Sequence, residues 1–154
     1  MADPEAWLRP STMAAWRALL ETHVRIMPLI DEQLDRDGDL THSQYGVLLA
    51  LQSEPQGLTM GEIARTMIVS KSGLTYQVSQ LVEAGRVTRA VDPDDSRRRV
   101  VRITRDGLDA LDDVREGHLA ILREHFEAPL SPEGMGALAD GLTTLNAHLR
   151  EDGA

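Results

Sequence analysis

Arginine is the residue type whose spacing in this sequence points most clearly to a chemistry. Between Arg65 and Arg105 the chain carries nine basic and four acidic residues, a local net charge of +5. The rest of the 154-residue chain carries 7 basic and 21 acidic residues. Because binding of a polyanion depends on the local field, the overall net charge of −9 does not exclude a nucleic-acid partner. The alternative at this point is an arginine-rich stretch that is only a solvated surface.

The other reactive residue types form weaker patterns. The sequence has no cysteine, which excludes disulfides, thiol catalysis and thiolate metal sites. Its five histidines include no His-x-x-His or His-x-x-x-His pair, the local spacing usual in zinc sites. No nucleophile elbow or glycine-rich phosphate loop frames a catalytic set. We therefore expect no catalytic residue, no cofactor and no metal ion.

Composition and hydropathy predict a cytoplasmic, helical protein. Aromatic residues make up 3% of the chain, so the core must be aliphatic, and abundant leucine and alanine with few β-branched runs favour helices. The longest uncharged stretch, Leu40 to Ser53, is too short to span a bilayer, which needs about 20 apolar residues. The acidic N-terminus and the lack of cysteine argue against secretion, so we expect the cytoplasm and no membrane partner.

Helical spacing and capping patterns predict four helices before Gly85. Apolar residues recur at steps of three and four over residues 11–36, with a kink expected at Pro28 and an end at residues 37–39. Residues 41–44 and 59–62 have the pattern of capping boxes and open the second and third helices. Ser70 is the expected N-cap of the fourth helix, and Gly85 closes it. The side of this fourth helix expected to be buried consists of Leu74, Val78, Leu81 and Val82.

After Gly85 the period of the pattern changes. Residues 86–91 and 99–104 alternate or are β-branched and flank the turn-forming residues 92–96, which predicts a β-hairpin with a charged tip. Two further helical stripes fill residues 104–150, with a break at Ala128-Pro129. The expected fold is mainly α (α+β), a single domain over residues 1–154. It consists of a winged helix-turn-helix lobe over residues 41–103 and long dimerisation helices over residues 11–36 and 104–150.

The fourth predicted helix has the two faces that a recognition helix needs. At about 100° per residue, its polar side chains lie opposite its apolar ones and are short enough to enter a major groove. Backbone amides, hydroxyls and an ammonium gather at its N-terminus, where they could hold a phosphate or a base edge. The alternative is ordinary solvation of a helix surface. The candidate DNA-contacting residues are Ser70, Lys71, Ser72, Thr75, Tyr76, Ser79 and Gln80.

Several runs of residues carry a resemblance to a known family. The runs 40–48, 60–64, 70–75, 81–89 and 92–104 resemble, in order, the MarR family of bacterial transcription regulators, and the likeness covers about residues 13–150. Its most specific part is the Asp-x-Arg wing followed by a hydrophobic strand and Thr104. The resemblance implies a homodimer of winged helix-turn-helix lobes on a pseudo-palindromic operator, usually as a repressor and often released by a small organic ligand.

The resemblance also implies roles for single residues of the wing. In that family the arginine of Asp-x-Arg enters the minor groove and the aspartate orients it, which here gives Arg97 and Asp95. Tyr76 stands where the family often has an arginine, and lysine occurs only once in the chain. Anchoring to phosphates would therefore depend on the arginines of the wing and on Arg65, Arg86 and Arg89. The DNA-binding residues expected on the wing are Asp95, Arg97, Arg98 and Arg99.

The family's ligands lie between the dimerisation helices and the DNA-binding lobe. In this sequence that position implies a pocket for an aromatic carboxylate or phenol, lined by Trp16, His23, Met27, His42 and Tyr45. The alternative is that all five side chains pack a helix interface with no vacancy. Some relatives bind a metal ion through histidines of separate helices, so His42 with His118 is a second alternative.

These patterns together predict a cytoplasmic, homodimeric, sequence-specific DNA-binding regulator. Leucine stripes at both ends of the chain need a partner surface, although they could also pack within one chain, and a two-fold dimer matches a palindromic site. The expected partners are double-stranded DNA, a second copy and a small aromatic effector. The alternative function is a winged-helix module that binds protein and not DNA, which would place apolar residues where Ser72, Tyr76 and Ser79 stand.

Overall fold

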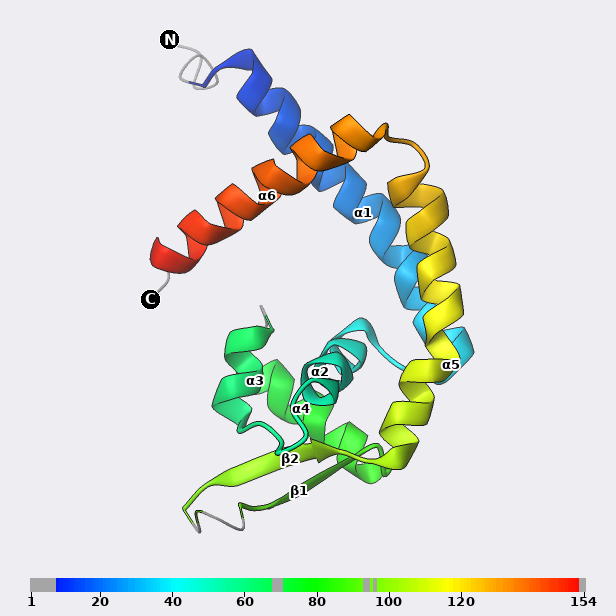
Figure 1. Ribbon diagram of the computed structural model, residues 1–154, viewed down its shortest axis with the longest axis vertical. Helices are drawn as coiled ribbons and strands as arrows, with labels where there is room; N and C mark the ends of the chain where they lie inside the picture. Colours follow the sequence, from blue (N-terminus) through cyan, green and yellow to red (C-terminus); the bar gives the residue numbers. More distant parts are fainter. Residues whose placement is uncertain (1–7, 68–70, 93–94, 96, 153–154) are drawn as a thin grey trace. The chain divides into compact units, whose positions relative to one another are not determined.

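The computed structural model describes residues 8–67, 71–92, 95 and 97–152 (Figure 1). Of residues 71, 72, 151 and 152 it describes the backbone only. The chain divides into two compact units, residues 1–118 and 119–154, which we treat separately. The elements in chain order are α1 (Pro10–Gly38), α2 (His42–Gln52), α3 (Met60–Thr66), α4 (Lys71–Glu83), β1 (Val87–Val91), β2 (Arg99–Ile103), α5 (Arg105–Leu122), a π-helical turn (Arg123–Glu127) and α6 (Pro132–Asp152). The predicted mainly α fold with a winged helix-turn-helix lobe is confirmed.

Local hydrogen bonds begin α2 and α3 where the sequence predicts. The Thr41 hydroxyl accepts from the backbone N–H of Gln44 at 3.2 Å, and the side chain of Gln44 accepts from the N–H of Thr41 at 3.0 Å. Thr59 and Glu62 form the same reciprocal pair. Both predicted capping boxes are therefore confirmed. Ser70, the expected N-cap of α4, lies outside the described residues.

The end of α1 packs closely against α5. The helix continues to Gly38, two residues beyond the predicted end, and the left-handed conformation falls on Asp39 with φ of +48°. A Cβ atom at Gly38 would overlap the side chain of Val114 on α5. Glycine is therefore needed here for close packing between helices and not for the turn itself. Pro28 lies within α1, which continues through it.

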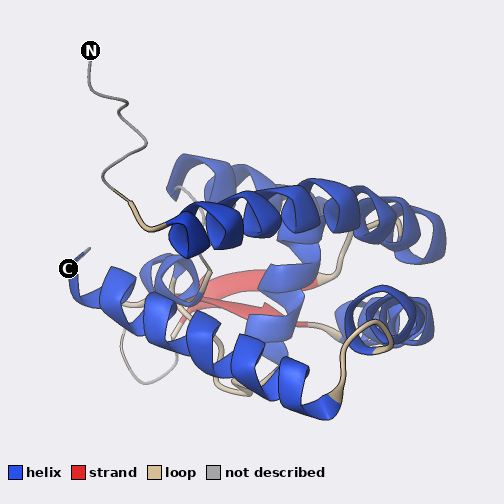
Figure 2. Cartoon of the chain, turned by 90° about the horizontal axis from the view of Figure 1, so that it is seen from above, coloured by secondary structure: helices blue, strands red, loops and turns tan. Residues whose placement is uncertain are grey.

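The wing is a two-stranded antiparallel sheet that is tied to the loop before α3. Strands β1 and β2, drawn in red in Figure 2, pair with Val87 opposite Ile103 and Val91 opposite Arg99. The bounds of the two strands agree with the predicted ones to within one residue. The sequence pattern did not predict a further bridge in which Leu58 and Val101 exchange two backbone hydrogen bonds, of 3.0 and 2.8 Å. Gly57 precedes this bridge with φ of +81°, a conformation that glycine adopts without strain.

The aliphatic core of the first unit holds the helix-turn-helix and the wing together. One expectation about it is wrong: Val82 is 39% exposed, whereas its neighbour Leu81 is buried. At about 100° per residue, Val78 and Leu81 lie within about 40° of Leu74 around the helix, whereas Val82 lies about 80° away, at the edge of the buried stripe. The fully buried aliphatic side chains of this unit are Leu34, Leu40, Val47, Leu48, Leu51, Ile63, Leu74, Val78, Leu81, Val87, Val100, Val101 and Val114.

The second unit contains the end of α5, the π-helical turn and α6. The π-helical turn was not predicted and ends at the expected break before Pro129. The Ser131 hydroxyl accepts from the N–H of Gly134 at 3.2 Å, as expected of a residue that caps α6. Along α6, Leu145 and Leu149 are exposed. None of the described helices has the length and apolar character needed to cross a membrane.

Candidate nucleic-acid interface

Helix α4 presents a polar surface opposite its buried side. Leu74, Val78 and Leu81 are buried. Thr75 and Tyr76 are exposed, the latter by 63%, which agrees with the two-faced pattern expected of a recognition helix. Two other candidates, Ser79 and Gln80, are half-buried; the Ser79 hydroxyl donates to the carbonyl of Thr75 and the Gln80 amide donates to Glu83. Lys71 and Ser72 belong to the first turn of α4, where their side chains are not described, and Ser70 lies outside the described residues.

The tip of the wing is closed by hydrogen bonds around Asp95. The N–H of Asp92 donates to the carbonyl of Arg98 at 2.8 Å, and the N–H of Arg98 donates to the carbonyl of Asp95 at 2.9 Å. The carboxylate of Asp95 accepts from the backbone N–H of Arg97 at 3.0 Å. Asp95 therefore shapes the turn through the main chain of Arg97. The side chains of Arg97 and Arg99 are exposed on this turn and on the strand that follows it.

Arg98 is held in ion pairs within the chain. One terminal nitrogen, Nη2, donates to both carboxylate oxygens of Glu62 on α3, at 2.9 and 2.8 Å, and Nη1 donates to Asp92 at 3.2 Å. The pKa of Glu62 is lowered to about 2, first by the hydrogen bond from the backbone of Thr59 and then by Arg98. Arg98 thus differs from its exposed neighbours Arg97 and Arg99, because its side chain is held by carboxylates of the same chain. The sequence position of Arg98 did not reveal this difference.

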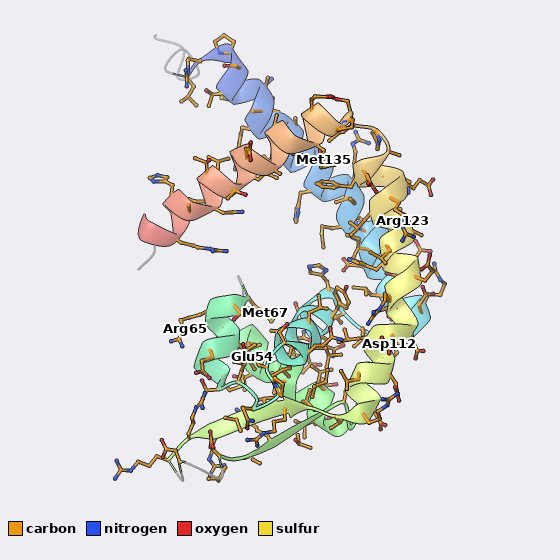
Figure 3. The ribbon with its side chains drawn as sticks, viewed as in Figure 1. Glu54, Arg65, Met67, Asp112, Arg123 and Met135 are labelled. Carbon is orange, nitrogen blue, oxygen red and sulfur yellow. The ribbon has the colours of Figure 1, made fainter. Side chains whose placement is uncertain are left out.

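The three other candidate phosphate contacts also differ from one another. Arg65 on α3, labelled in Figure 3, and Arg89 on β1 are exposed. Arg86 instead donates through Nη2 to the carbonyl of Gly38 at 2.8 Å and through Nη1 to the carbonyl of Asp39 at 2.7 Å. Carbonyl groups at a helix C-terminus lack intrahelical partners and favour a cation. Arg86 therefore supplies hydrogen-bond donors to two carbonyl groups at the C-terminal end of α1.

The sequence and the fold both match known proteins. The sequence model of the MarR family matches residues 38–98, from the end of α1 to the wing. The crystal structure of AbsC, a MarR family transcriptional regulator from Streptomyces coelicolor, is 31% identical with a TM-score of 0.83 and aligns over 94% of this chain and 98% of that chain. The chain belongs to the MarR family. This MarR-family protein is a DNA-binding transcriptional regulator.

Two further comparisons agree with the family assignment. Sco3205, a MarR family transcriptional regulator from Streptomyces coelicolor whose structure contains DNA, is 28% identical, has a TM-score of 0.85 and aligns over 93% of this chain and 94% of that chain. A Thauera aromatica protein named for transcriptional regulation of the hcr operon is 33% identical over 101 residues, which are 64% of this chain and 58% of that protein. The match to this relative thus spans less than two thirds of its length.

The residues expected to line a ligand pocket are divided between α1 and α2. Trp16 and His23 on α1 are exposed and Met27 is half-buried; on α2, His42 is exposed and Tyr45 half-buried. The ring of Tyr45 packs on an α5 residue that the expected lining omitted, His118, with ring centroids 4.9 Å apart.

The ring of His118 is partly enclosed. Its Nδ1 atom is buried and has no hydrogen-bond partner among the described residues. Burial, and secondarily the charge of His42, lowers the pKa of His118. The helical stripe of α5, with Val114 one turn and Leu111 two turns earlier, could have indicated from the sequence that position 118 faces inward. No group of three or more His, Asp or Glu side chains suited to a metal ion occurs in the described part of the chain.

Proposed function

We propose that this MarR-family protein binds a pseudo-palindromic DNA operator as a homodimer and represses transcription from it. The observation that carries this proposal is the pairing of an exposed polar face on α4 with a wing that presents Arg97 and Arg99 to solvent. A protein-binding module would instead place apolar residues where Ser72, Tyr76 and Ser79 stand. The basic segment supplies the local positive field that a polyanion needs.

The residues have separate roles in this proposal. Arg97 enters the minor groove, where narrow A·T-rich segments concentrate negative potential. Asp95 holds the backbone of Arg97 in place by accepting a hydrogen bond from its N–H. The α4 surface, with Ser70, Lys71 and Ser72 at its start, contacts the major groove. Arg65, Arg89 and Arg99 contact phosphates, whereas the hydrogen bonds of Arg86 and Arg98 assign these two residues to holding the lobe together.

The homodimer is supported by apolar surface on the long helices. Trp16, Leu19, Leu20 and Val24 form an exposed apolar stretch on α1. In the second unit, α6 exposes leucines as well. Covering such stretches with a second copy removes apolar area from water, which is favourable. A two-fold dimer also places two recognition helices about one DNA turn apart. No enzymatic activity is expected, and we place the protein in the cytoplasm.

A small aromatic effector would act at the cluster of His42, Tyr45 and His118 together with Trp16, His23 and Met27. Such a ligand releases DNA only if it binds the DNA-incompetent arrangement more tightly, with a coupling of about 1–3 kcal/mol. By reciprocity, bound operator must lower the affinity of the protein for the ligand by the same factor. Calorimetric titration of aromatic acids with and without operator tests this; a ligand that binds equally in both is no inducer.

The central experiment identifies the operator. Sequences recovered with the purified protein from fragmented DNA of the source organism are tested as labelled duplexes beside scrambled duplexes. We expect tight binding to the recovered sequence, and an Arg97→Ala variant that binds it more weakly by about 1–3 kcal/mol and loses preference at the minor-groove position. Equal affinity for scrambled DNA, or affinity independent of salt, contradicts operator binding.

A further inference from the structure

The side chain of Arg98 connects the tip of the wing to α3. We infer that Glu62 and Arg98 are positioning residues that hold the wing in a fixed orientation to the helix-turn-helix, so that Arg97 and α4 contact the same operator together. This inference rests on the proposed function. It assigns to Glu62 a role in DNA recognition that does not require contact with DNA.

Arg98 joins the wing tip to α3 through its backbone and its side chain. Its backbone closes the wing tip through Asp92 and Asp95, with hydrogen bonds of 2.8 and 2.9 Å. Its guanidinium then reaches Asp92 at 3.2 Å with one terminal nitrogen and Glu62, 36 residues earlier in the chain, with the other. Because Arg97 is the preceding residue, any movement of the Arg98 backbone moves Arg97 as well.

Glu62 is itself held in place by the start of α3. Its Oε2 atom accepts from the backbone N–H of Thr59 at 2.7 Å, and its own N–H donates to the Thr59 hydroxyl at 3.3 Å. The next residue, Ile63, is buried and fixes α3 in the core. The carboxylate therefore faces Arg98 from a rigid position.

A second link beside this ion pair defines the orientation of the wing. Leu58, immediately before Thr59, exchanges two backbone hydrogen bonds with Val101 in the middle of β2. A two-stranded hairpin is only marginally stable alone. The buried side chains of β1 and β2, together with this bridge, hold the base of the wing against the core. The ion pair between Glu62 and Arg98 lies three residues nearer the wing tip than Val101, so it holds the tip as well.

The same pair contributes little to stability. The side chains of Arg98 and Glu62 are 36% and 31% exposed, and ion pairs that water reaches are screened. Its loss should therefore lower operator affinity much more than it lowers the melting temperature. This difference separates a positioning role from a merely structural one.

Replacement of Glu62 by glutamine gives the sharpest test, because two explanations predict opposite signs. Glu62→Gln removes a negative charge near the DNA, so electrostatics alone predicts tighter binding. Glutamine can still complete a capping box. Its single oxygen must serve both Thr59 and Arg98, however, where the carboxylate has two. Positioning therefore predicts binding to the operator about two- to tenfold weaker, with a nearly unchanged melting temperature.

The experiment measures operator affinity and melting temperature for Glu62→Gln and Arg98→Ala, each alone and combined with Arg97→Ala. The control is Arg115→Ala, which removes an exposed arginine paired with Asp112 on α5. We expect Glu62→Gln and Arg98→Ala each to weaken operator binding in the wild-type background. In the Arg97→Ala background each should weaken binding by less than about twofold more, because the effects of coupled residues are not additive. Arg115→Ala should match the wild type.

Several results overturn the inference. Tighter or unchanged binding by Glu62→Gln contradicts a positioning role. If Arg98→Ala lowers operator affinity equally with and without Arg97, and the slope of log affinity against log salt becomes less steep by about 1.8 for a dimer, then Arg98 contacts phosphate directly. Should Arg98→Ala fail to fold, the double-mutant cycle of Glu62→Gln and Arg97→Ala decides, because an equal loss of affinity for Glu62→Gln with and without Arg97 contradicts a positioning role. A wild-type protein that does not distinguish operator from scrambled DNA refutes the proposed function instead.

Discussion

Replacing Arg86 and replacing Arg89 should affect DNA binding differently, although the two residues lie three positions apart and carry the same charge. Arg89 is exposed on β1, whereas the guanidinium of Arg86 donates to the carbonyls of Gly38 and Asp39 at 2.8 and 2.7 Å. If Arg89 contacts a phosphate as proposed, alanine at position 89 should remove that contact. Alanine at position 86 removes a cap from the end of α1.

The size of the first effect follows from the exposed arginines of the lobe. Among the residues whose side chains are described, four candidate arginines are exposed on the proposed interface: Arg65, Arg89, Arg97 and Arg99. Two protomers present eight such groups, so at about 0.9 per phosphate the slope of log affinity against log salt should be roughly −7. Arg89→Ala removes one contact per protomer and should make that slope less steep by roughly 1.8.

Arg86→Ala should leave the slope unchanged and lower stability. It leaves two carbonyls without charge-assisted hydrogen bonds, a loss of about 1–3 kcal/mol in the free energy of unfolding. Fluorescence anisotropy of a labelled operator between about 50 and 200 mM salt measures the slope, and urea unfolding measures stability. Equal slope changes in both variants would refute the assignment, as would an Arg86→Ala variant of wild-type stability.

Three further outcomes are expected. Gly117→Ala should destabilise the protein by about 1–3 kcal/mol in urea unfolding, because its Cβ would overlap the amide of Gln33 in the α1–α5 contact. The control Gly136→Ala should not destabilise it, because nothing lies within 4 Å of a Cβ at that position. Equal stability of the two variants would contradict the packing argument. The pKa of His118 in the folded state lies below its ordinary value of 6.5, so the stabilising effect of the neutral ring is present above pH 6.5 and is lost as the pH falls through the folded-state pKa. Melting curves of His118→Phe should therefore show a melting temperature that depends less on pH below 6.5. A pH dependence equal to that of the wild type argues against burial of the ring. Insertion of 5 bp between half-sites whose centres lie about 10 bp apart should abolish operator binding in a gel-shift experiment, since it rotates one half-site to the opposite side of the duplex, and undiminished binding contradicts the two-fold dimer.

Features that depend on neighbours within a few residues could be predicted from the sequence. The capping boxes at Thr41 and Thr59 join residues three positions apart, and the turn at Gly85 needs only a residue that accepts a positive φ, here +72°. The alternation that predicted β1 and β2 has a period of two and is equally local. These signals determined the helix-turn-helix, the wing and the polar face of α4, and with them the position of Arg97.

Which arginines remain exposed was decided by the tertiary structure. Arg86 bonds to residues 47 and 48 positions away, and Arg98 to a carboxylate 36 positions away. In the sequence, Arg98 between Arg97 and Arg99 cannot be distinguished from them, because all three carry the same charge in the same charged turn. A guanidinium takes a partner within the chain only when folding brings a carboxylate or an unsatisfied carbonyl within about 3 Å, and that proximity depends on how distant elements pack.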